Sequence, residues 1–315
     1  MRRILVTGGA GFIGSEFIRQ MMKYTEDEVT NVDLLTYASS ENALREVDSH
    51  PRYRFIQGDV SKKSDVERIF EQPYDVVVHF AAESHVDRSI ESPERFLETN
   101  IMGTYQLLKQ IKRSPQTRFL QVSTDEVYGS LGNGDSSFTS TTPLSPTNPY
   151  AVSKASADML VLSYVRTYGI KAMVSRCSNN YGPYQHEEKF IPKVIRNALT
   201  NQPIPIYGDG QQIRDWLFVE DHCEGLRKLL DVGKSGEVYH FGGLQEKRNI
   251  EVVEQVLAYL QKPRSLLQHV QDRKGHDYRY SMCWKETEKS IKWRPSTPFD
   301  EGLKRTIRWY EENMK

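Results

Sequence analysis

The stretch from residue 1 to residue 14 constrains the fold more than any other part of the chain. A short apolar run at residues 4–7 predicts a β-strand, a turn with the spacing Gly8-x-x-Gly11-x-x-Gly14 follows it, and a helical pattern continues to about Lys23. In dinucleotide-binding units such glycines allow a tight turn, close approach of a pyrophosphate and close helix packing. The phosphates then lie at the helix N-terminus. We therefore predict a cofactor loop here rather than a structural turn.

The next strand ends on an acid whose position predicts which cofactor is bound. Residues 28–32 form this strand, and Asp33 follows it about twenty residues after Gly14. A carboxylate there accepts hydrogen bonds from the adenosine ribose and repels a 2′-phosphate, which favours NAD over NADP. The alternative is an aspartate that caps the following loop.

Strands and helices alternate through the first half of the chain. Further strands are predicted at 53–57, 75–80, 118–123 and 171–176, with helical patterns between them. This alternation predicts an α/β fold with a parallel, doubly wound (Rossmann) sheet. After residue 178 the rhythm becomes irregular, so we expect a cofactor-binding domain at 1–178 that carries the catalytic residues and a smaller substrate-binding α/β domain at 179–315, allowing for the chain to cross back between them. Residues 129–148, rich in Gly, Ser, Thr and Pro, predict a mobile loop beside the site.

Composition excludes several classes of partner. Lys plus Arg and Asp plus Glu are equal at 42 each, so there is no basic field for nucleic acid and no polybasic block for a membrane surface. No apolar run approaches the ~18 residues that cross a bilayer. Cys177, Cys223 and Cys283 are odd in number and widely spaced, which fits neither a disulfide framework nor a zinc site. We expect a soluble, cytoplasmic protein with a small-molecule substrate and no metal.

The chemistry is predicted at the end of the strand at 118–123. The chain there enters Thr124-Asp125-Glu126, and strand ends are where α/β proteins place catalytic groups. Tyr150 and Lys154 are four residues apart at the start of a helix, so their side chains face the same way. A nearby ammonium favours phenolate and lowers the pKa of a tyrosine from about 10. The alternative is an ordinary surface pair.

Other positions are suggestive when taken singly. Asp59 and Val60 follow the third strand and suit the adenine edge, while Ala81 and Ala82 follow the fourth and let a cofactor pass close. His79 and His85 flank that turn, where a lone histidine is more often structural than a ligand. Arg214, Arg273 and His276 stand in polar turns and suit a diphosphate, although an exposed arginine needs no such role.

Several of these motifs together resemble a known superfamily. Gly8 to Gly14, Asp33, Tyr150 with Lys154, and the run 176–183 resemble the extended short-chain dehydrogenase/reductases, which act on nucleotide sugars. Within that superfamily, residues 123–129, 35–38 and 81–90 resemble the signature of dTDP-glucose 4,6-dehydratases. Epimerases and decarboxylases of the superfamily keep the Tyr and Lys but do not pair Asp with Glu at this strand end.

The resemblance implies an NAD-dependent lyase that converts dTDP-glucose to dTDP-4-keto-6-deoxyglucose and water, a step in deoxysugar biosynthesis such as that of rhamnose. It implies that Tyr150 removes the 4-hydroxyl proton, Glu126 the carbon 5 proton, and Asp125 protonates the departing 6-hydroxyl. Asp125 must then be protonated while Glu126 is ionised. The backbone must also curl at Thr124, because neighbours in a regular strand point to opposite faces. A homodimer is implied as well, paired through helices near 96–111 and 150–168.

The resemblance also supplies a full set of site residues. The catalytic set is Thr124, Asp125, Glu126, Tyr150 and Lys154. The NAD-binding set is Gly8, Gly11, Phe12, Ile13, Gly14, Asp33, Thr36, Asp59, Val60, Ala81, Ala82, Thr99, Tyr150 and Lys154. The substrate-binding set is Ser84, Thr124, Asn180, Lys189, Arg214, Asn249, Arg273 and His276. Two departures are visible, since Ser39-Ser40 replaces an expected Gly-Asn and Lys274 stands where a Pro is usual.

Three alternatives stay open at this stage. The first is a related epimerase or dehydratase acting on another nucleotide sugar, such as UDP-glucose. The second is a catalytically silent NAD-binding sensor, against which the intact Tyr150, Lys154, Asp125 and Glu126 argue. The third, a plain secondary-alcohol dehydrogenase, predicts that NADH accumulates.

Overall fold

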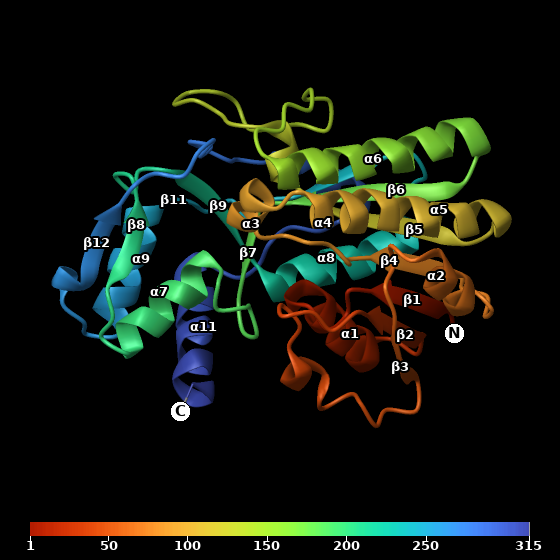
Figure 1. Ribbon diagram of the computed structural model, residues 1–315, viewed down its shortest axis with the longest axis horizontal. Helices are drawn as coiled ribbons and strands as arrows, with labels where there is room; N and C mark the ends of the chain where they lie inside the picture. Colours follow the sequence, from red (N-terminus) through yellow and green to blue (C-terminus); the bar gives the residue numbers. More distant parts are fainter. Residues whose placement is uncertain (315) are drawn as a thin grey trace.

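The structure is a computed structural model that describes residues 1–314, and its centre is a seven-stranded sheet (Figure 1). All neighbouring strands in this sheet run parallel. The strand order is β10-β6-β5-β4-β1-β2-β3, so the order reverses direction beside β1, as in a doubly wound sheet. The strands span Arg3–Thr7 (β1), Glu28–Asp33 (β2), Tyr53–Gln57 (β3), Val76–His79 (β4), Arg118–Thr124 (β5), Lys171–Cys177 (β6) and Val238–Phe241 (β10). The predicted α/β class and Rossmann sheet are confirmed.

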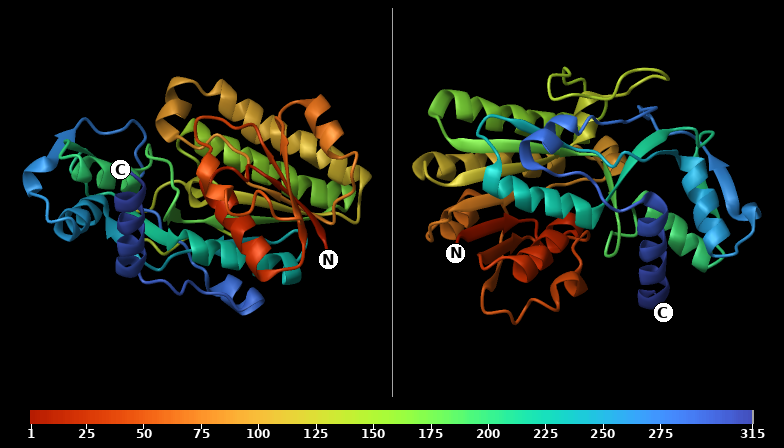
Figure 2. Two further views of the ribbon diagram at one scale, coloured as in Figure 1. Left: turned by 90° about the horizontal axis from the view of Figure 1, so that it is seen from below. Right: turned by 180° about the vertical axis from the view of Figure 1, so that it is seen from behind.

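Helices cover both faces of this sheet (Figures 1 and 2). One layer holds α2 (Lys63–Ile69), α5 (Thr104–Arg113) and α6 (Pro149–Tyr168), and the other holds α1 (Phe12–Tyr24), α8 (Val219–Val232) and α10 (Lys285–Ile291). The strand sequences explain the two layers, because successive side chains point to opposite faces. Val76 and Val78 of β4 pack in the core with α1 and α8, whereas Val77 packs in the core with α5 and α6. Both faces are buried at the central strands β1 and β4, which are mostly apolar, whereas the edge strand β3 is partly exposed.

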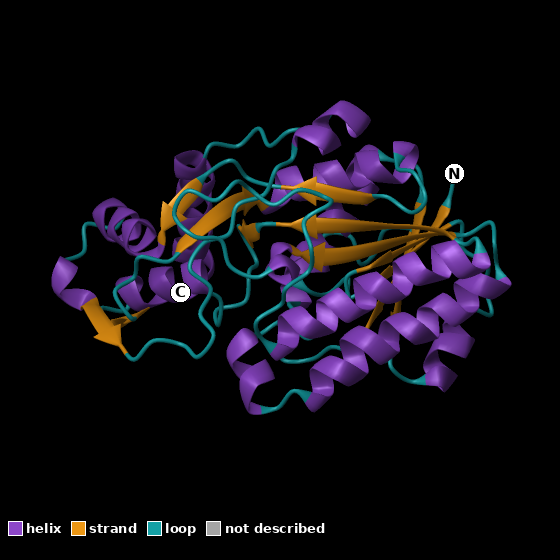
Figure 3. Ribbon diagram, turned by 90° about the horizontal axis from the view of Figure 1, so that it is seen from above, coloured by secondary structure: helices purple, strands orange, loops and turns teal. Residues whose placement is uncertain are grey.

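A smaller group of elements lies beyond the carboxyl ends of the large sheet (Figures 1 and 3). It contains a three-stranded sheet, β11 (Glu246–Arg248), β9 (Ile213–Phe218) and β7 (Asn179–Tyr181), and a two-stranded sheet, β12 (Leu267–Val270) and β8 (Ile204–Tyr207). Helices α7 (Phe190–Leu199), α9 (Asn249–Tyr259) and α11 (Phe299–Asn313) enclose its own apolar core. Trp216, Phe218 and Phe299 are the large buried side chains of that core.

The chain crosses between the two groups more than once. After β7, α7, β8 and β9 it returns to the large sheet, where α8 packs on one face and β10 pairs with β6 at the edge. It then leaves for β11, α9 and β12 and returns again in α10. Residues of the C-terminal half therefore complete the edge and one face of the Rossmann sheet.

The loop at 129–148, which the sequence predicts to be mobile, is attached to a later segment of the chain. Leu131 donates a backbone hydrogen bond to Arg279 at 3.0 Å, and Phe138 both donates to Ser281 and accepts from Cys283. Arg279 also donates from its guanidinium to the Asp135 carbonyl at 2.9 Å. These bonds anchor the loop, because they pair backbone groups that a free loop would leave to water.

Among residues 1–314, no helix is both long enough and apolar enough to span a bilayer.

Candidate active site

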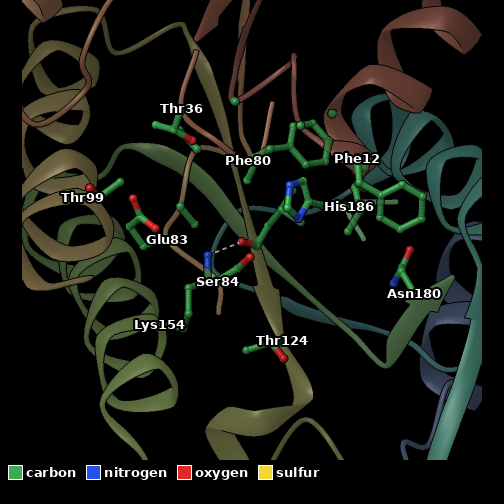
Figure 4. A pocket seen from close by; sticks show the side chains of 18 of the residues that line it. Phe12, Thr36, Phe80, Glu83, Ser84, Thr99, Thr124, Lys154, Asn180 and His186 are labelled. Atoms are coloured by element: carbon green, nitrogen blue, oxygen red, sulfur yellow. Dashed lines mark hydrogen bonds between the residues drawn. The ribbon is translucent and has the colours of Figure 1, made fainter. Parts of the chain in front are cut away.

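A deep cavity of about 320 Å³ opens at the carboxyl ends of β1, β2, β4, β5 and β6, between the large sheet and the smaller group. Ligands of doubly wound proteins bind at this edge. In Figure 4, Thr36 lies at one end of the pocket and Thr124 and Lys154 lie at the other, with Thr99 and Glu83 on one wall and Phe12 and Asn180 on the opposite wall. All fourteen residues of the sequence-predicted NAD-binding set line this cavity.

The glycine turn between β1 and α1 has the shape that a dinucleotide requires. Gly8 has a φ of +73°, and a Cβ there would lie 2.5 Å from the Ala81 backbone nitrogen, so no other residue fits without a shift. Gly11 precedes α1 without any side-chain cap, which leaves the first N–H groups of the helix to face the cavity that Phe12 and Ile13 line. Such N–H groups bind phosphate. The turn therefore fits a pyrophosphate.

Asp33 ends β2 at the same edge and is held firmly. One carboxylate oxygen accepts from the Ala10 N–H at 2.9 Å, and the other accepts from the Leu35 N–H at 2.8 Å and from the Ser39 hydroxyl at 3.1 Å. Ser39 is one of the two departures from the expected pattern, and it lines the cavity beside Asp33. The carboxylate is thus fixed at the position where an adenosine ribose would donate its hydroxyls.

Tyr150 and Lys154 lie in the first turns of α6 and both line the cavity. The Lys154 ammonium donates to the Val122 carbonyl of β5 at 2.7 Å, and burial lowers its pKa. Burial, and then the charge of Glu126, raise the pKa of Tyr150 well above its usual value. In the protein alone, burial therefore outweighs the lowering of the Tyr150 pKa that the sequence predicts from Lys154.

The backbone leaves β5 immediately after Thr124, so that consecutive acids reach the same cavity. Residues Asp125–Tyr128 form a 3₁₀ turn (η3), and the Thr124 hydroxyl caps it by accepting from the Glu126 N–H at 3.2 Å. Asp125 and Glu126 both line the cavity, together with Tyr150. This arrangement meets the geometric condition that the sequence set for paired acid and base chemistry.

A buried polar chain holds the far end of η3. The hydroxyl of Tyr128 accepts from the Arg176 guanidinium at 2.5 Å and is 2.7 Å from Nε2 of His240. Arg176 also donates from Nε to Asp158 at 2.9 Å, and this ion pair is almost wholly buried. Three separate elements, β6, β10 and α6, therefore fix the turn that carries the two acids.

The two acids differ in their surroundings. Burial, followed by the charges of Glu126 and Asp215, raises the pKa of Asp125 well above its usual value. Burial also raises the pKa of Glu126, but the cations Arg214, Lys189 and Arg273 oppose this shift. The surroundings therefore favour the protonated form of Asp125 more strongly than that of Glu126.

The predicted substrate-binding residues fall into two groups. Ser84, Asn180 and Lys189 line the cavity with Thr124, and Lys189 donates to the Ser84 carbonyl at 2.7 Å. The other four, Arg214, Asn249, Arg273 and His276, lie outside the lining of the cavity. Arg214 donates to the carbonyls of Asp277 and Ile213, and its charge and that of Arg273 reach Glu126 and His276. Asn249 begins α9, close in the chain to Lys247, which pairs with Arg214 in the β9–β11 ladder.

A π-helical turn (η2, Leu97–Gly103) brings Thr99 to the cavity wall. Asn100 in this turn is buried, accepts from the Glu83 N–H at 2.9 Å, and donates to the Glu83 carbonyl and to the Ser153 hydroxyl. Asn100 therefore joins the segment after β4 to helix α6. Turns of this kind are frequent at functional sites.

Sequence reasoning missed several polar residues of the cavity, among them Glu83, Gln185, His186 and Glu188. Glu188 lies 3.8 Å from His85 and 3.7 Å from Arg88, and it accepts from the Tyr37 hydroxyl at 3.4 Å. The available signal was the polar run at 185–189, which lies between Gly182-Pro183 and helix α7. Polar residues gathered just before a helix in an α/β protein commonly line a site.

The fold and this cavity are those of a Rossmann protein with a dinucleotide-binding turn, and comparison with known proteins gives the family. The family model for GDP-mannose 4,6 dehydratase matches residues 5–306, and the chain belongs to this family. The resemblance to dehydratases of the extended short-chain dehydrogenase/reductases is thereby confirmed.

Particular relatives are similar over the full length. The chain is 48% identical to the dTDP-glucose 4,6-dehydratase of Neisseria meningitidis, over 99% of this chain and 94% of that protein. It is 45% identical to dTDP-glucose 4,6-dehydratase 1 of Escherichia coli, over 99% and 94%. The solved structure of DesIV, a dTDP-glucose 4,6-dehydratase from Streptomyces venezuelae with NAD bound, has a TM-score of 0.95 and 46% identity over 99% of this chain and 97% of that chain.

Proposed function

We propose that this protein is an NAD-dependent dTDP-glucose 4,6-dehydratase, a hydro-lyase that converts dTDP-glucose to dTDP-4-keto-6-deoxyglucose and water. The observation that carries the proposal is the convergence of Asp125, Glu126 and Tyr150 on one cavity that also contains a dinucleotide turn. An alcohol dehydrogenase needs only the tyrosine, whereas elimination of water needs an acid and a base as well. Relatives of this activity that match the whole chain support the assignment.

NAD, when bound, would supply a hydride acceptor that can also return the hydride within one turnover. The turn at Gly8 fits its pyrophosphate and the Asp33 carboxylate its adenosine ribose. The walls at Ala81 and Ala82 leave room for its close approach.

The protein side chains then have separate tasks. With NAD bound, the positive charges of the nicotinamide and of the nearby Lys154 would favour ionised Tyr150, which then accepts the proton of the 4-hydroxyl. Once carbon 4 is a ketone, the proton on carbon 5 becomes acidic, and Glu126 removes it. Asp125, whose pKa is raised by burial and by Glu126, donates its proton to the departing 6-hydroxyl, which leaves as water. When hydride returns to carbon 6, Glu126 gives a proton back to carbon 5, and Thr124 positions the sugar between these groups.

The direct test is to incubate the purified protein and NAD with dTDP-glucose and with UDP-glucose in separate reactions. Loss of one water from dTDP-glucose, followed by mass spectrometry and without accumulation of NADH, is the expected result. Equal turnover of UDP-glucose would broaden the assignment to either base. If neither sugar loses water, the roles of Asp125 and Glu126 are wrong, and NADH accumulation or inertness then separates a dehydrogenase from an NAD-binding sensor.

The remaining proposals concern organisation. We propose that residues 1–178, with β10, α8 and α10, form the NAD-binding domain, and that the rest of 179–315 mainly binds the nucleotide sugar. We propose a homodimer through α6 and η2, because Val152, Met159, Leu97 and Met102 expose apolar side chains on these neighbouring elements. A cytoplasmic location and a role in rhamnose supply stay predictions.

A further inference from the structure

Arg273 and Asp87 form an ion pair that joins the two groups of elements. Arg273 lies in the loop after β12, and Asp87 lies in the short helix α3 (Val86–Glu91), just after the cavity residue Ser84. Nε of Arg273 is 2.5 Å from one carboxylate oxygen of Asp87, and Nη2 is 2.9 Å from the other. Tyr207 of β8 completes the contact, because its hydroxyl donates to Asp87 at 3.4 Å and its ring lies 5.0 Å from the Arg273 guanidinium.

The geometry of this pair leaves part of the guanidinium available. An arginine has five N–H donors in a planar fork, and the contact with Asp87 uses the edge formed by Nε and Nη2. In the part of the chain that the structure describes, Nη1 of Arg273 makes no hydrogen bond within the protein. The edge formed by Nη1 and the second N–H of Nη2 has the shape that binds two oxygens of a phosphate.

The Arg273–Asp87 pair lies beside the cavity, because Asp87 is only three residues after Ser84, which lines the cavity. The Tyr207 ring, which lies against Arg273, also packs edge-on against His276 at 6.1 Å between ring centroids, and the charge of Arg273 opposes the rise in the pKa of Glu126. The segment that carries Asp87 also receives Lys189, whose ammonium donates to the carbonyl and the hydroxyl of Ser84 at 2.7 and 3.2 Å. Two cations of the smaller group are thus held by one short segment of the Rossmann side.

We propose that Asp87 is a positioning residue that holds Arg273 with its free edge toward the diphosphate of the nucleotide sugar. This inference rests on the proposed function, because it takes the ligand to be a nucleoside diphosphate sugar. The carboxylate replaces many rotamers of a long side chain by one, so that binding does not have to order the arginine. Asp87 itself does not touch the substrate.

The ionised carboxylate of Asp87 explains why an acid at this position can hold Arg273. Burial alone would raise the pKa of Asp87, but the hydrogen bonds and charge of Arg273 outweigh burial and lower it. The carboxylate is therefore ionised throughout the neutral range and offers Arg273 a bidentate partner. An asparagine has the same shape but only one acceptor oxygen and no charge. Asp87→Asn therefore removes the bidentate ion pair with Arg273 with little change in volume.

The test measures binding of dTDP to the NAD-loaded protein by calorimetry, for the wild type, Asp87→Asn, Arg273→Ala and the double variant. We expect Asp87→Asn to weaken binding about tenfold, with a raised KM for the sugar nucleotide and a kcat within about twofold of the wild type. In the Arg273→Ala background, Asp87→Asn should add almost nothing, since its effect passes through the arginine. Glu91→Gln, an exposed acid on the same helix, is the matched control and should bind as the wild type does.

Three outcomes overturn the inference. Unchanged binding in Asp87→Asn would show that the pair does not position the arginine, and tighter binding would show that Asp87 competes with the diphosphate. An equal loss in the presence and absence of Arg273 would show a general effect on the fold, which the melting temperature of each variant would confirm. If the wild type binds no dTDP, the proposed function fails and this inference with it; wild-type binding with a normal Asp87→Asn variant overturns the inference alone.

Discussion

The two ends of the cavity are built in different ways. At the dinucleotide end, the site consists mainly of backbone and small side chains, with Gly8 against Ala81 and the N–H groups of Ala10 and Leu35 on Asp33. At the acid end, it consists of ionisable side chains whose pKa values are raised by burial and then modified by charges from remote segments, such as Asp215 for Asp125 and Arg214 for Glu126. The dinucleotide end depends on close approach of the cofactor to the backbone, and the acid end depends on burial and on charges from remote segments. Substitutions at the first end should therefore reduce NAD binding, and substitutions at the second should reduce the loss of water.

The largest effect should come from neutralising the acid end. Asp125→Asn removes the proton donor for the departing hydroxyl without changing the volume of the side chain, so we expect kcat for loss of water to fall about 10²- to 10⁴-fold. The affinity for NAD, measured by calorimetry, should not change, because Asp125 is at the other end of the cavity from Asp33. Glu224→Gln, an exposed carboxylate of α8, serves as the control. Loss of NAD binding in Asp125→Asn would show that the two ends are not independent.

A substitution in the glycine turn should have the opposite pattern. Gly8→Ala places a Cβ 2.5 Å from the Ala81 nitrogen at a φ of +73°, so NAD binding should be lost and the free energy of unfolding should also fall. Gly169→Ala is a matched control, because its φ is +65° but its Cβ would meet nothing within 4 Å. The control should cost only the left-handed strain of about 1–2 kcal/mol and leave NAD binding intact. Equal NAD binding in the two variants would contradict the close-approach argument.

The stability of the acid end should also depend on pH through Asp215, whose charge acts on Asp125. Burial raises the pKa of Asp215 to about 6, above its value of about 3.9 in the unfolded chain. A carboxyl whose pKa is raised by folding contributes to the free energy of unfolding. This contribution is complete below the pKa of the unfolded state and is lost as the pH rises through the pKa of the folded state. The free energy of unfolding should therefore decrease between about pH 4 and about pH 6, and Asp215→Asn should flatten this part of the profile. Denaturant titrations across this range give the slope, and an unchanged slope in the variant would refute the assignment.

The smallest effect should come from a surface ion pair that belongs to neither end. Lys228 and Glu224 of α8 are 2.7 Å apart, and both side chains are about two-fifths exposed, at 42% and 40%. Removing such a pair costs roughly 0.3–0.5 kcal/mol because solvent screens it. Glu224→Gln should change the unfolding midpoint slightly, and less at high salt, while the activity stays at the wild-type level. An activity change beyond twofold would mean that α8 is coupled to the cavity.

The sequence predicts the dinucleotide end well and the acid end only in part, and the reason is the same physical difference. The turn at Gly8 and the acid at Asp33 are contiguous with strands, and their roles follow from backbone requirements that are visible within about thirty residues. The pKa order of Asp125 and Glu126 depends on Arg214, Lys189 and Asp215, which folding brings from remote positions. Folding also brings Arg273 to Asp87, and residues 185–188 to the cavity, from remote positions in the chain. Neither contact was therefore predicted from the sequence.

Two further features needed the tertiary structure. The sequence places a lysine beside Tyr150, but only the fold shows that burial raises the pKa of Tyr150 in the protein alone and that the Lys154 ammonium donates to the Val122 carbonyl. The return of β10 to the edge of the Rossmann sheet follows from its pairing with β6, which no local pattern at residues 238–241 indicates.

In the proposed mechanism, hydride leaves carbon 4 of the sugar, water is eliminated, and the same hydride returns to carbon 6, all within one cavity. The most direct test uses dTDP-glucose carrying deuterium at carbon 4, incubated with the NAD-loaded protein in ordinary water, and locates the label in the product by mass spectrometry and NMR. If the hydride is transferred internally, the product will have lost one water and will carry the deuterium at carbon 6. A dehydrated product without deuterium at carbon 6, or deuterium that accumulates in the reduced cofactor without loss of water, would contradict it.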